Sequence, residues 1–210
     1  GVRISEGFGM SETGSNFAMP AHDLDTLLRK AGSCGLPLMT VETRIVDDEG
    51  NDVPTGERGE LWVRGPCVAH GYWRQPELTA KAFVDGWFVT GDAAMKDEDG
   101  FFYIFDRKKD MYISGGENVY PAEVEAALAE LTSIGECAVV GVPDERWGEV
   151  GRAYVIAVAG QSVTSEDVIA HCTARLAKFK VPKTAVITDT IPRTASGKVQ
   201  KHILRARALE

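Results

Sequence analysis

The segment GFGMSETG, residues 7–14, combines residue types that could bind a nucleotide. Phe8 offers a flat apolar ring for stacking on a base, and the hydroxyl of Ser11 could contact a phosphate. Glu12 supplies a negative charge that could hold a metal ion. Glycines on both sides, Gly9 among them, free the backbone for a tight loop. An ordinary glycine-rich surface loop has the same composition, so this segment alone leaves both interpretations open.

Two further segments combine glycine with a charged or hydroxyl side chain. In GWFVTGD (86–92), Asp92 stands where a strand ends, and could accept hydrogen bonds from a pair of ribose hydroxyls. An Asp after a strand is also a common turn residue. In DRKKDMYISGGENVYPAEVE (106–125), Gly115 and Gly116 would let the backbone approach a thin ligand closely. A flexible loop before a helix explains the same pair.

The C-terminal segment is basic in an acidic chain. The net charge is −8, yet nine Lys or Arg stand between Arg175 and Arg207 against a single acid, Asp189. Within this segment, in PRTASGKVQK (192–201), the Lys198 ammonium could stabilise charge on a phosphoryl or acyl oxygen, or be a plain surface lysine. The segment predicts a localised anionic ligand, with a solvated basic face as the alternative. The acidic remainder argues against a nucleic-acid partner.

Composition limits the class of protein further. The chain has 210 residues, of which 44% are hydrophobic and 26% charged, as in ordinary globular proteins. No apolar run approaches the roughly 20 residues of a membrane span, so no transmembrane segment is expected. The cysteines show no metal-ligand spacing and predict reduced thiols of a cytoplasmic protein; they are Cys34, Cys67, Cys137 and Cys172.

Short alternating segments dominate the first half of the chain. Val41 and Ile45 alternate with polar residues, and Leu61 and Val63 share one face of a second segment. The pattern predicts strands within 38–64, at 87–92 and at 101–106, and a short helix at 76–83. This half is therefore expected to be rich in β-structure.

Beyond DRKKD (106–110) the pattern alternates between helix and strand. A helix from Pro121 places Val124, Ala127, Leu128 and Leu131 on one face. A second helix over 162–179, capped by Thr164 or Ser165, would turn Ile169, Cys172 and Leu176 inward. With strands at ECAVVGV, RAYVIAVA and TAVITD and a basic terminal helix, the pattern predicts a three-strand, three-helix α+β domain from about residue 109.

In order and spacing, the motifs GFGMSET, GELWVRGP, GWFVTGD, DRKKDMYISGGENVYPAEVE and PRTASGK together resemble the acyl-adenylate-forming superfamily of AMP-binding enzymes. DMYISGGENVYP and FKVPK are most similar to bacterial fatty-acyl-CoA synthetases. The resemblance covers nearly the whole chain and implies a mixed α/β fold. Residues 1–106 would be the β-rich C-terminal part of the large AMP-binding domain, and residues 107–210 the small, mobile α+β lid domain.

The resemblance assigns the first motif to ATP. Phe8 would stack on adenine, with Gly9 in the same nucleotide-binding loop, and Ser11 would contact the phosphates. Glu12 would hold Mg²⁺ against them, which suits a hard oxygen ligand. Most family members have Tyr in place of Phe8 and Thr in place of Ser11, and both changes keep the ring face and the hydroxyl.

The later motifs are implied in the nucleotide and thiol sites. Asp92 would bind the ribose hydroxyls with help from Arg107. Lys109 is counted with these nucleotide-site residues and matches the hinge position between the domains. Lys198 matches the lysine that contacts the carboxylate and the α-phosphate during adenylation. The loop that lines the pantetheine tunnel would consist of Ser114, Gly115 and Gly116. The CoA phosphates could pair with basic residues among Lys178, Lys180, Lys183 and Arg193.

An ATP-dependent acid–thiol ligase is the activity that the resemblance implies. A carboxylate attacks the α-phosphorus of ATP, giving acyl-AMP and pyrophosphate, and CoA then displaces AMP. We expect the acid to be a medium- or long-chain fatty acid. An aromatic or short-chain acid CoA ligase, or an acyl-AMP ligase that loads a carrier protein, is the alternative. A binding module without catalysis is a further alternative of a different class.

The resemblance also predicts what the chain lacks. The family's phosphate-binding loop and most of its acyl pocket are expected upstream of residue 1. We therefore expect a C-terminal portion that is inactive alone and has the missing N-terminal part of the enzyme as its partner. PRTASGK also resembles the pattern at which bacterial acetyltransferases modify such synthetases, so a lysine acetyltransferase acting on Lys198 is a further expected partner.

Overall fold

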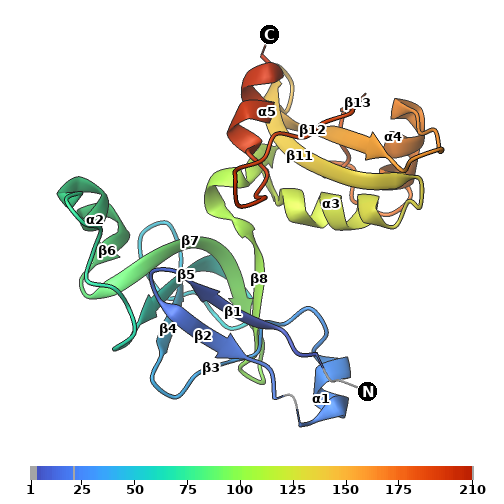
Figure 1. Cartoon of the computed structure of the whole chain (residues 1–210). Helices are drawn as coiled ribbons and strands as arrows, with labels where there is room; N and C mark the ends of the chain where they lie inside the picture. Colours follow the sequence, from blue (N-terminus) through green and yellow to red (C-terminus); the bar gives the residue numbers. More distant parts are fainter. Residues whose placement is uncertain (1–3, 21, 210) are drawn as a thin grey trace. The chain divides into compact units, whose positions relative to one another are not determined.

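The computed structural model describes residues 4–20 and 22–209. The chain forms two compact units, Gly1–Lys108 and Lys109–Glu210 (Figure 1). Each unit has a hydrophobic core of its own. The domain boundary after residue 106, expected from the sequence, stays a prediction.

The first unit is built on an antiparallel five-stranded sheet. Its order is β4-β5-β7-β6, and β8 pairs with β7. The strands are β4 (Glu42–Val46), β5 (Arg58–Arg64), β6 (Phe83–Val84), β7 (Trp87–Lys96) and β8 (Phe102–Arg107). The predictions of strands in these segments are confirmed. The helix predicted at 76–83 is also confirmed, as α2 (Pro76–Ala82).

A small second sheet in this unit was not predicted. It has the order β1-β2-β3, with β1 (Gly7–Met10), β2 (Gly14–Ala18) and β3 (Leu36–Pro37). The interpretation of residues 7–14 as a loop holds only for the turn at 11–13, because residues 7–10 form β1 and pair with β2 as a hairpin. Helix α1 (Leu24–Arg29) was missed too, since six residues are too few to show a helical period.

The core of the first unit lies where the two sheets meet. The rings of Phe17 from β2 and Phe102 from β8 are 4.7 Å apart between centroids. Leu61 and Val63 of β5 are fully buried in the same cluster, as their alternation predicted. The small sheet, which carries residues 7–14, is thus fixed to the large one by apolar packing.

The second unit contains a five-stranded sheet rather than the three strands that were expected. The order is β10-β9-β12-β11, and β13 pairs with β12 in parallel. The additional strands are β9 (Tyr112–Ser114) and β10 (Glu117–Val119), which form a hairpin. Each has three residues, too few for an alternating pattern to be recognised. The other strands are β11 (Ile134–Asp144), β12 (Gly148–Ala157) and β13 (Thr184–Ile187).

The helices of the second unit largely follow the sequence pattern. They are the short 3₁₀ helix η1 (Lys108–Asp110), which spans the division between the units, and α3 (Pro121–Ala129), α4 (Ser165–Thr173) and α5 (Lys201–Arg207). Thr164 caps α4 through a capping box with Asp167, as predicted. The helix ends at Thr173 and does not reach residue 179. Beyond it, Leu176 and Phe179 pack on the core from turns instead.

Both faces of this sheet are covered. Val139 and Val155 face the core under α3 and α4, while Val140 and Tyr154 face a second core under α5. Figure 1 shows α3 and α5 on opposite sides of β11 and β12. Because side chains alternate along a strand, a continuous apolar run supplies both cores.

Candidate active site

Glu12 lies at the tip of the β1–β2 hairpin. The turn is closed by a hydrogen bond from the Thr13 amide to the Met10 carbonyl (3.2 Å), and Gly14 adopts a φ of +63° that other residues rarely take. Below the tip, buried Thr13 accepts a hydrogen bond from the Asn16 amide at 2.6 Å. This packing from beneath presents Ser11 and Glu12 at the end of the hairpin.

The ring of Phe8 lies on the same hairpin. It is half-buried and packs against Phe17, with ring centroids 6.0 Å apart. The ring is therefore supported by the core and keeps part of its surface accessible. A planar apolar partner, such as a nucleobase, could stack on that part. Gly9 lies in the following position of the strand, where an added Cβ would stand 2.4 Å from the Gly14 carbonyl oxygen, so only glycine fits.

A second segment holds Glu12 from the other side. The Ala69 amide donates to the Glu12 carbonyl at 2.7 Å, and the Tyr72 hydroxyl donates to Oε1 of the Glu12 carboxylate at 2.9 Å. Burial and the hydrogen bond with Glu12 raise the pKa of Tyr72, while the positive charge of Arg107 acts in the opposite direction. The phenol therefore donates to Glu12 and is close enough to Arg107 for its charge to act on the phenol pKa.

Asp92 and Arg107 form the second part of the site. They face each other across β7 and β8, and Nε of Arg107 lies 3.1 Å from a carboxylate oxygen of Asp92. Arg107 also donates to the Thr90 carbonyl at 2.7 Å. Burial raises the pKa of Asp92 to about 6, partly offset by the charge of Arg107. The expectation that Asp92 ends a strand is wrong, since β7 continues to Lys96.

The single carboxylate of Glu12 fits a cation that is also bound by the phosphates of a nucleotide. No cluster of three or more His, Cys, Asp or Glu that could hold a metal occurs among residues 4–20 and 22–209. Mg²⁺ needs no such cluster, because it is commonly held by one or two carboxylates together with phosphate oxygens. The single carboxylate at the hairpin tip is therefore compatible with Mg²⁺ carried by a nucleotide.

Lys109, the predicted hinge residue, stands at the start of the second unit within η1. Arg205 of α5 holds this position: its guanidinium donates to the Lys109 carbonyl at 3.3 Å and to a carboxylate oxygen of Asp110 at 2.8 Å. The terminal helix thus fixes the chain immediately after the division between the two units.

The paired glycines form the tip of the β9–β10 hairpin. Gly115 and Gly116 have φ values of +63° and +88°. The Gly115 amide donates to the Trp147 carbonyl at 2.8 Å, and an added Cβ would stand 2.5 Å from the Trp147 ring. Ser114 is buried at 2% exposure, while both glycines are exposed. The hairpin thus offers bare backbone, which a thin ligand could approach.

Lys198 projects from a short loop after β13. Its amide donates to the Thr194 hydroxyl at 3.1 Å, and its carbonyl accepts from the Thr194 amide at 2.8 Å. Arg193 crosses the loop to donate to the Gly197 carbonyl and forms an ion pair with Glu136 of β11. The exposed ammonium is therefore carried by an ordered loop.

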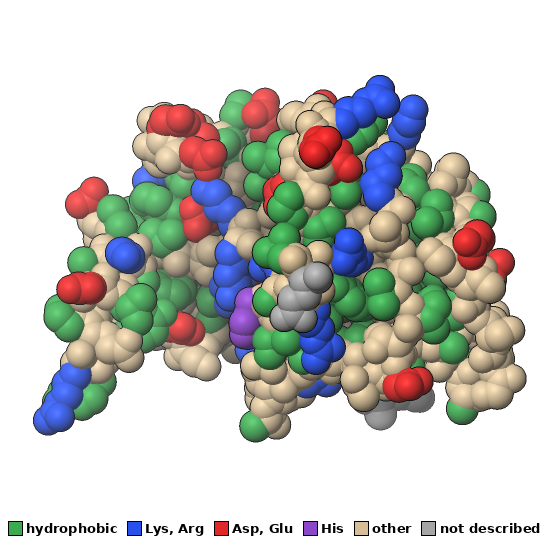
Figure 2. All heavy atoms as spheres, turned by 90° about the horizontal axis from the view of Figure 1, so that it is seen from above, with side chains coloured by type: hydrophobic (Ala, Val, Ile, Leu, Met, Phe, Trp, Pro, Cys, Tyr) green, Lys and Arg blue, Asp and Glu red, His purple; other side chains and the backbone are tan. Residues whose placement is uncertain are grey.

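The basic C-terminal segment is largely compensated within the second unit. Figure 2 shows one face of the molecule, on which both basic and acidic side chains reach the surface. Five of the nine basic residues pair with acids of the same unit: Arg175 with Glu130, Lys180 with Glu123, Arg193 with Glu136, Lys201 with Glu125, and Arg205 with Asp110. The charge of this segment is therefore mainly structural.

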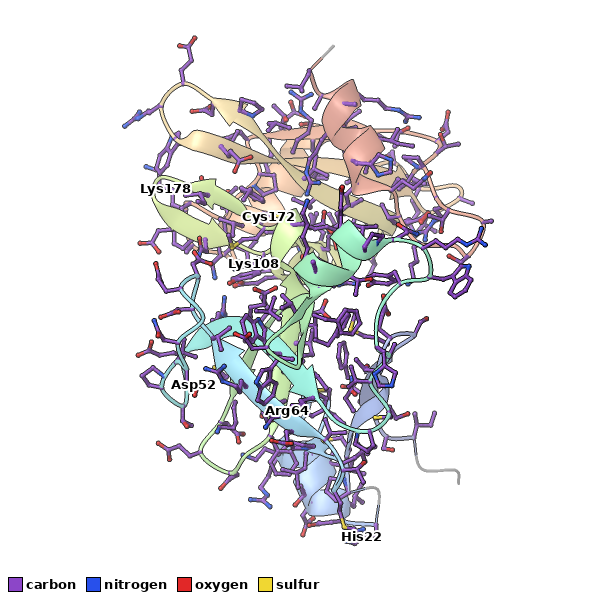
Figure 3. All side chains as sticks on the ribbon, turned by 90° about the vertical axis from the view of Figure 1, so that its left-hand side faces the viewer. His22, Asp52, Arg64, Lys108, Cys172 and Lys178 are labelled. Carbon is purple, nitrogen blue, oxygen red and sulfur yellow. The ribbon has the colours of Figure 1, made fainter. Side chains whose placement is uncertain are left out.

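Two other lysines border an apolar hollow of about 440 Å³ in the same unit. Lys178, labelled in Figure 3, and Lys183 line it together with Ile169, Leu176 and Pro182. The Lys183 ammonium also lies 5.2 Å from the centroid of the Trp147 ring. Among the basic residues considered for CoA, these two flank a cavity, whereas Lys180 and Arg193 are engaged in ion pairs.

The predicted site residues divide between the two units. Those of the first unit are Phe8, Gly9, Ser11, Glu12, Asp92 and Arg107, and those of the second are Lys109, Ser114, Gly115, Gly116 and Lys198. Sequence reasoning missed Tyr72, Arg193 and Arg205 as partners of these residues. Tyr72 lies in the segment GYW, just before the helix that begins at PELT. Nothing in that local sequence indicates its contact with Glu12, 60 residues away.

Comparison with known proteins decides the family. The model of the AMP-binding enzymes matches residues 1–73, and that of the AMP-binding enzyme C-terminal domain matches residues 123–198. The chain belongs to the AMP-binding, adenylate-forming enzymes. The family resemblance seen in the sequence is thereby confirmed.

Individual relatives are CoA ligases for different acids. Feruloyl-CoA synthase of Amycolatopsis sp is 45% identical over 207 residues, covering 99% of this chain and 42% of that protein. Long-chain-fatty-acid–CoA ligase of Yersinia pestis is 42% identical over 205 residues, covering 98% and 36%. The chain thus spans about 40% of the length of these relatives.

A solved relative confirms the mixed α/β fold class. The o-succinylbenzoate CoA synthetase of Bacillus subtilis, in complex with its acyl-adenylate intermediate, aligns with a TM-score of 0.89 at 35% identity. The alignment covers 99% of this chain and 41% of that one. In residues 4–20 and 22–209, no helix is both long enough and apolar enough to span a membrane.

Proposed function

We propose that this chain is part of an ATP-dependent acid–thiol ligase, an AMP-forming acyl-CoA synthetase. The reaction joins a carboxylate to ATP, giving acyl-AMP and pyrophosphate, and CoA then displaces AMP to give acyl-CoA. The observation that carries the proposal is the pairing of Asp92 with Arg107 in a chain whose relatives are CoA ligases. A buried carboxylate held by a guanidinium is well suited to accept hydrogen bonds from ribose hydroxyls.

In the first half-reaction, the residues of this chain bind and align ATP. Phe8 stacks on the base, Asp92 accepts from the ribose hydroxyls, and Ser11 donates to a phosphate oxygen. Mg²⁺, when bound with the nucleotide at Glu12, supplies neutralisation of phosphate charge. Lys198 adds an ammonium near the α-phosphate, where it stabilises the charge that develops as the carboxylate attacks.

In the second half-reaction, the second unit presents a different surface. It rotates at Lys109 so that Lys198 leaves and the loop of Ser114, Gly115 and Gly116 lines the path of the pantetheine thiol. The hairpin geometry supports this role, because two glycines with positive φ leave the backbone uncovered. Lys178 and Lys183, at the apolar hollow, are the proposed contacts for the CoA phosphates.

For the acid itself, we keep medium- and long-chain fatty acids as the proposal. A relative named for long-chain fatty acids supports it, and one named for an aromatic acid supports the alternative at similar identity. Loading of a carrier protein is the other alternative. Inactivity of residues 1–210 alone, acetylation of Lys198 by a lysine acetyltransferase and a cytoplasmic location stay predictions.

The test uses the complete natural polypeptide that contains these 210 residues. With ATP, Mg²⁺, CoA and a panel of aliphatic and aromatic acids, mass spectrometry should detect acyl-AMP and then acyl-CoA. Lys198→Ala should lose acyl-AMP formation by at least a hundredfold and keep thioester formation from supplied acyl-AMP. Lys81→Ala, a change at an exposed lysine on α2, is the control. Acyl-AMP that persists when CoA is present would refute CoA as the acceptor and indicate a carrier protein.

A further inference from the structure

Glu12 is a long, half-buried side chain at the tip of a hairpin, and it is a poor metal ligand unless a contact orders it. Freezing a free glutamate costs conformational entropy each time a cation binds. An interaction that fixes the carboxylate beforehand lowers that cost and so strengthens binding. Contacts that hold Glu12 in place would therefore favour cation binding.

One segment holds Glu12 at two points. Ala69 donates its amide to the Glu12 carbonyl at 2.7 Å, and Tyr72 donates its hydroxyl to Oε1 at 2.9 Å. The first bond fixes the backbone of Glu12 and the second fixes its side chain. Two anchors from the same segment leave the carboxylate little freedom to rotate.

Tyr72 is itself held firmly. Its amide donates to the Thr79 hydroxyl at 2.9 Å, and its ring meets Phe83 edge-on, with centroids 6.0 Å apart. Gly71, the preceding residue, has a φ of +152°, and an added Cβ there would stand 2.5 Å from the Thr79 methyl group. The phenol therefore rests on α2 and β6 and can act as a rigid support.

The chemistry of the donor also suits a cation site. A Lys or Arg could hold Glu12 equally well, but its charge would cancel the charge that attracts a cation. The Tyr72 hydroxyl is neutral, so it holds the carboxylate without adding a positive charge to it. Within residues 4–20 and 22–209, Oε2 of Glu12 has no hydrogen-bond donor, so that oxygen is left for a metal.

We propose that Tyr72 is a positioning residue, which aims Oε2 of Glu12 at the divalent cation bound with ATP. The inference rests on the proposed function, because it needs Glu12 to hold that cation. Tyr72 touches neither the nucleotide nor the reacting atoms in this proposal. Its whole contribution passes through the carboxylate.

The test measures cation binding directly in the complete natural polypeptide. Electron paramagnetic resonance follows Mn²⁺ binding in the presence of α,β-methylene-ATP, an analogue that cannot form acyl-AMP. Tyr72→Phe removes only the hydroxyl and should weaken Mn²⁺ binding roughly tenfold, the lower end of the effect of second-layer partners of metal ligands. Tyr103→Phe is the matched control, because Tyr103 also donates to a carboxylate, that of Asp97, at 3.3 Å in the same unit.

A double-mutant cycle separates positioning from a general loss of structure. In the Glu12→Gln background, Tyr72→Phe should have no further effect on Mn²⁺ binding, since the route of its action is gone. A further loss in that background, or unchanged Mn²⁺ binding in Tyr72→Phe alone, would overturn the inference while leaving the role of Glu12 standing. Unchanged Mn²⁺ binding in Glu12→Gln would instead overturn the metal role of Glu12, and the inference with it.

Discussion

The buried carboxylate of Asp92 makes the stability of the first unit depend on pH in a calculable way. Burial raises its pKa to about 6, against 3.8 for an exposed aspartate. The side chain is only 7% exposed, so solvent screens this effect little. At a pH between these two pKa values, Asp92 has lost its proton in the unfolded chain but still holds it in the folded chain.

The size of the change in the free energy of unfolding follows from the linkage between proton binding and folding. The folded state binds more protons in this window, so the free energy of unfolding falls as pH rises. Each unit of pKa difference corresponds to about 1.4 kcal/mol, and the difference of roughly two units gives about 3 kcal/mol. The cost is absent below pH 4, grows between pH 4 and 6, and is constant above pH 6.

Asp92→Asn isolates this contribution, because the amide does not titrate. Urea unfolding of the chain and of the variant at pH 4, 5, 6 and 7 would give the difference in their free energies of unfolding. The wild type should lose about 3 kcal/mol relative to the variant between pH 4 and pH 7. Asp85→Asn, at an exposed aspartate whose positive φ an asparagine also tolerates, is the control. A difference that stays flat, or a wild type that gains stability over this range, would refute the reasoning.

Three further outcomes can be measured by the same unfolding assay. Leu128→Ala, at a fully buried position in the core under α3 and α4, should cost about 3 kcal/mol, whereas Ile113→Ala, half-exposed in the same unit, should cost about 1 kcal/mol or less. Equal losses would contradict the assigned core. Gly115→Ala should destabilise more than Gly116→Ala, because both have positive φ but only at Gly115 would the added Cβ meet the Trp147 ring, at 2.5 Å. An equal effect would argue against that contact. Thr164→Ala removes the capping box of α4 and should cost about 1 kcal/mol, with Thr173→Ala, at the last residue of the same helix, as the comparison.

Long periodic elements of this fold could be predicted from the sequence, and short ones could not. The helix from Pro121 buries Val124 and Leu128 as its period indicates. The strands β9 and β10 have three residues each and the helix α1 has six, too few for a repeating pattern that would distinguish them from loops. The end of α4 at Thr173 is decided by packing, because the apolar residues that follow reach the same core from turns.

The site residues could be predicted from local motifs, whereas the contacts that hold them could not. Residue types and motif order indicated Glu12, Asp92 and Lys198. The contacts that hold them join residues far apart in the chain: Tyr72 reaches Glu12 across 60 residues, and the loop of Lys198 is tied through Arg193 to Glu136 of β11. Such contacts depend on how strands and loops meet in space, which no local pattern specifies.

The pairing of Asp92 with Arg107 depends on the register between β7 and β8. Near the turn, Ala94 of β7 pairs with Ile104 of β8, and continuing that register would set Asp92 opposite Asp106. Two carboxylates would then face each other, which is unfavourable across a strand pair. An irregularity between Ala93 and Ala94 shifts the register by one residue and sets Asp92 opposite Arg107 instead. Because a one-residue shift exchanges the faces of a strand, this single irregularity converts a repulsive pair into the ion pair on which the proposed ribose site depends.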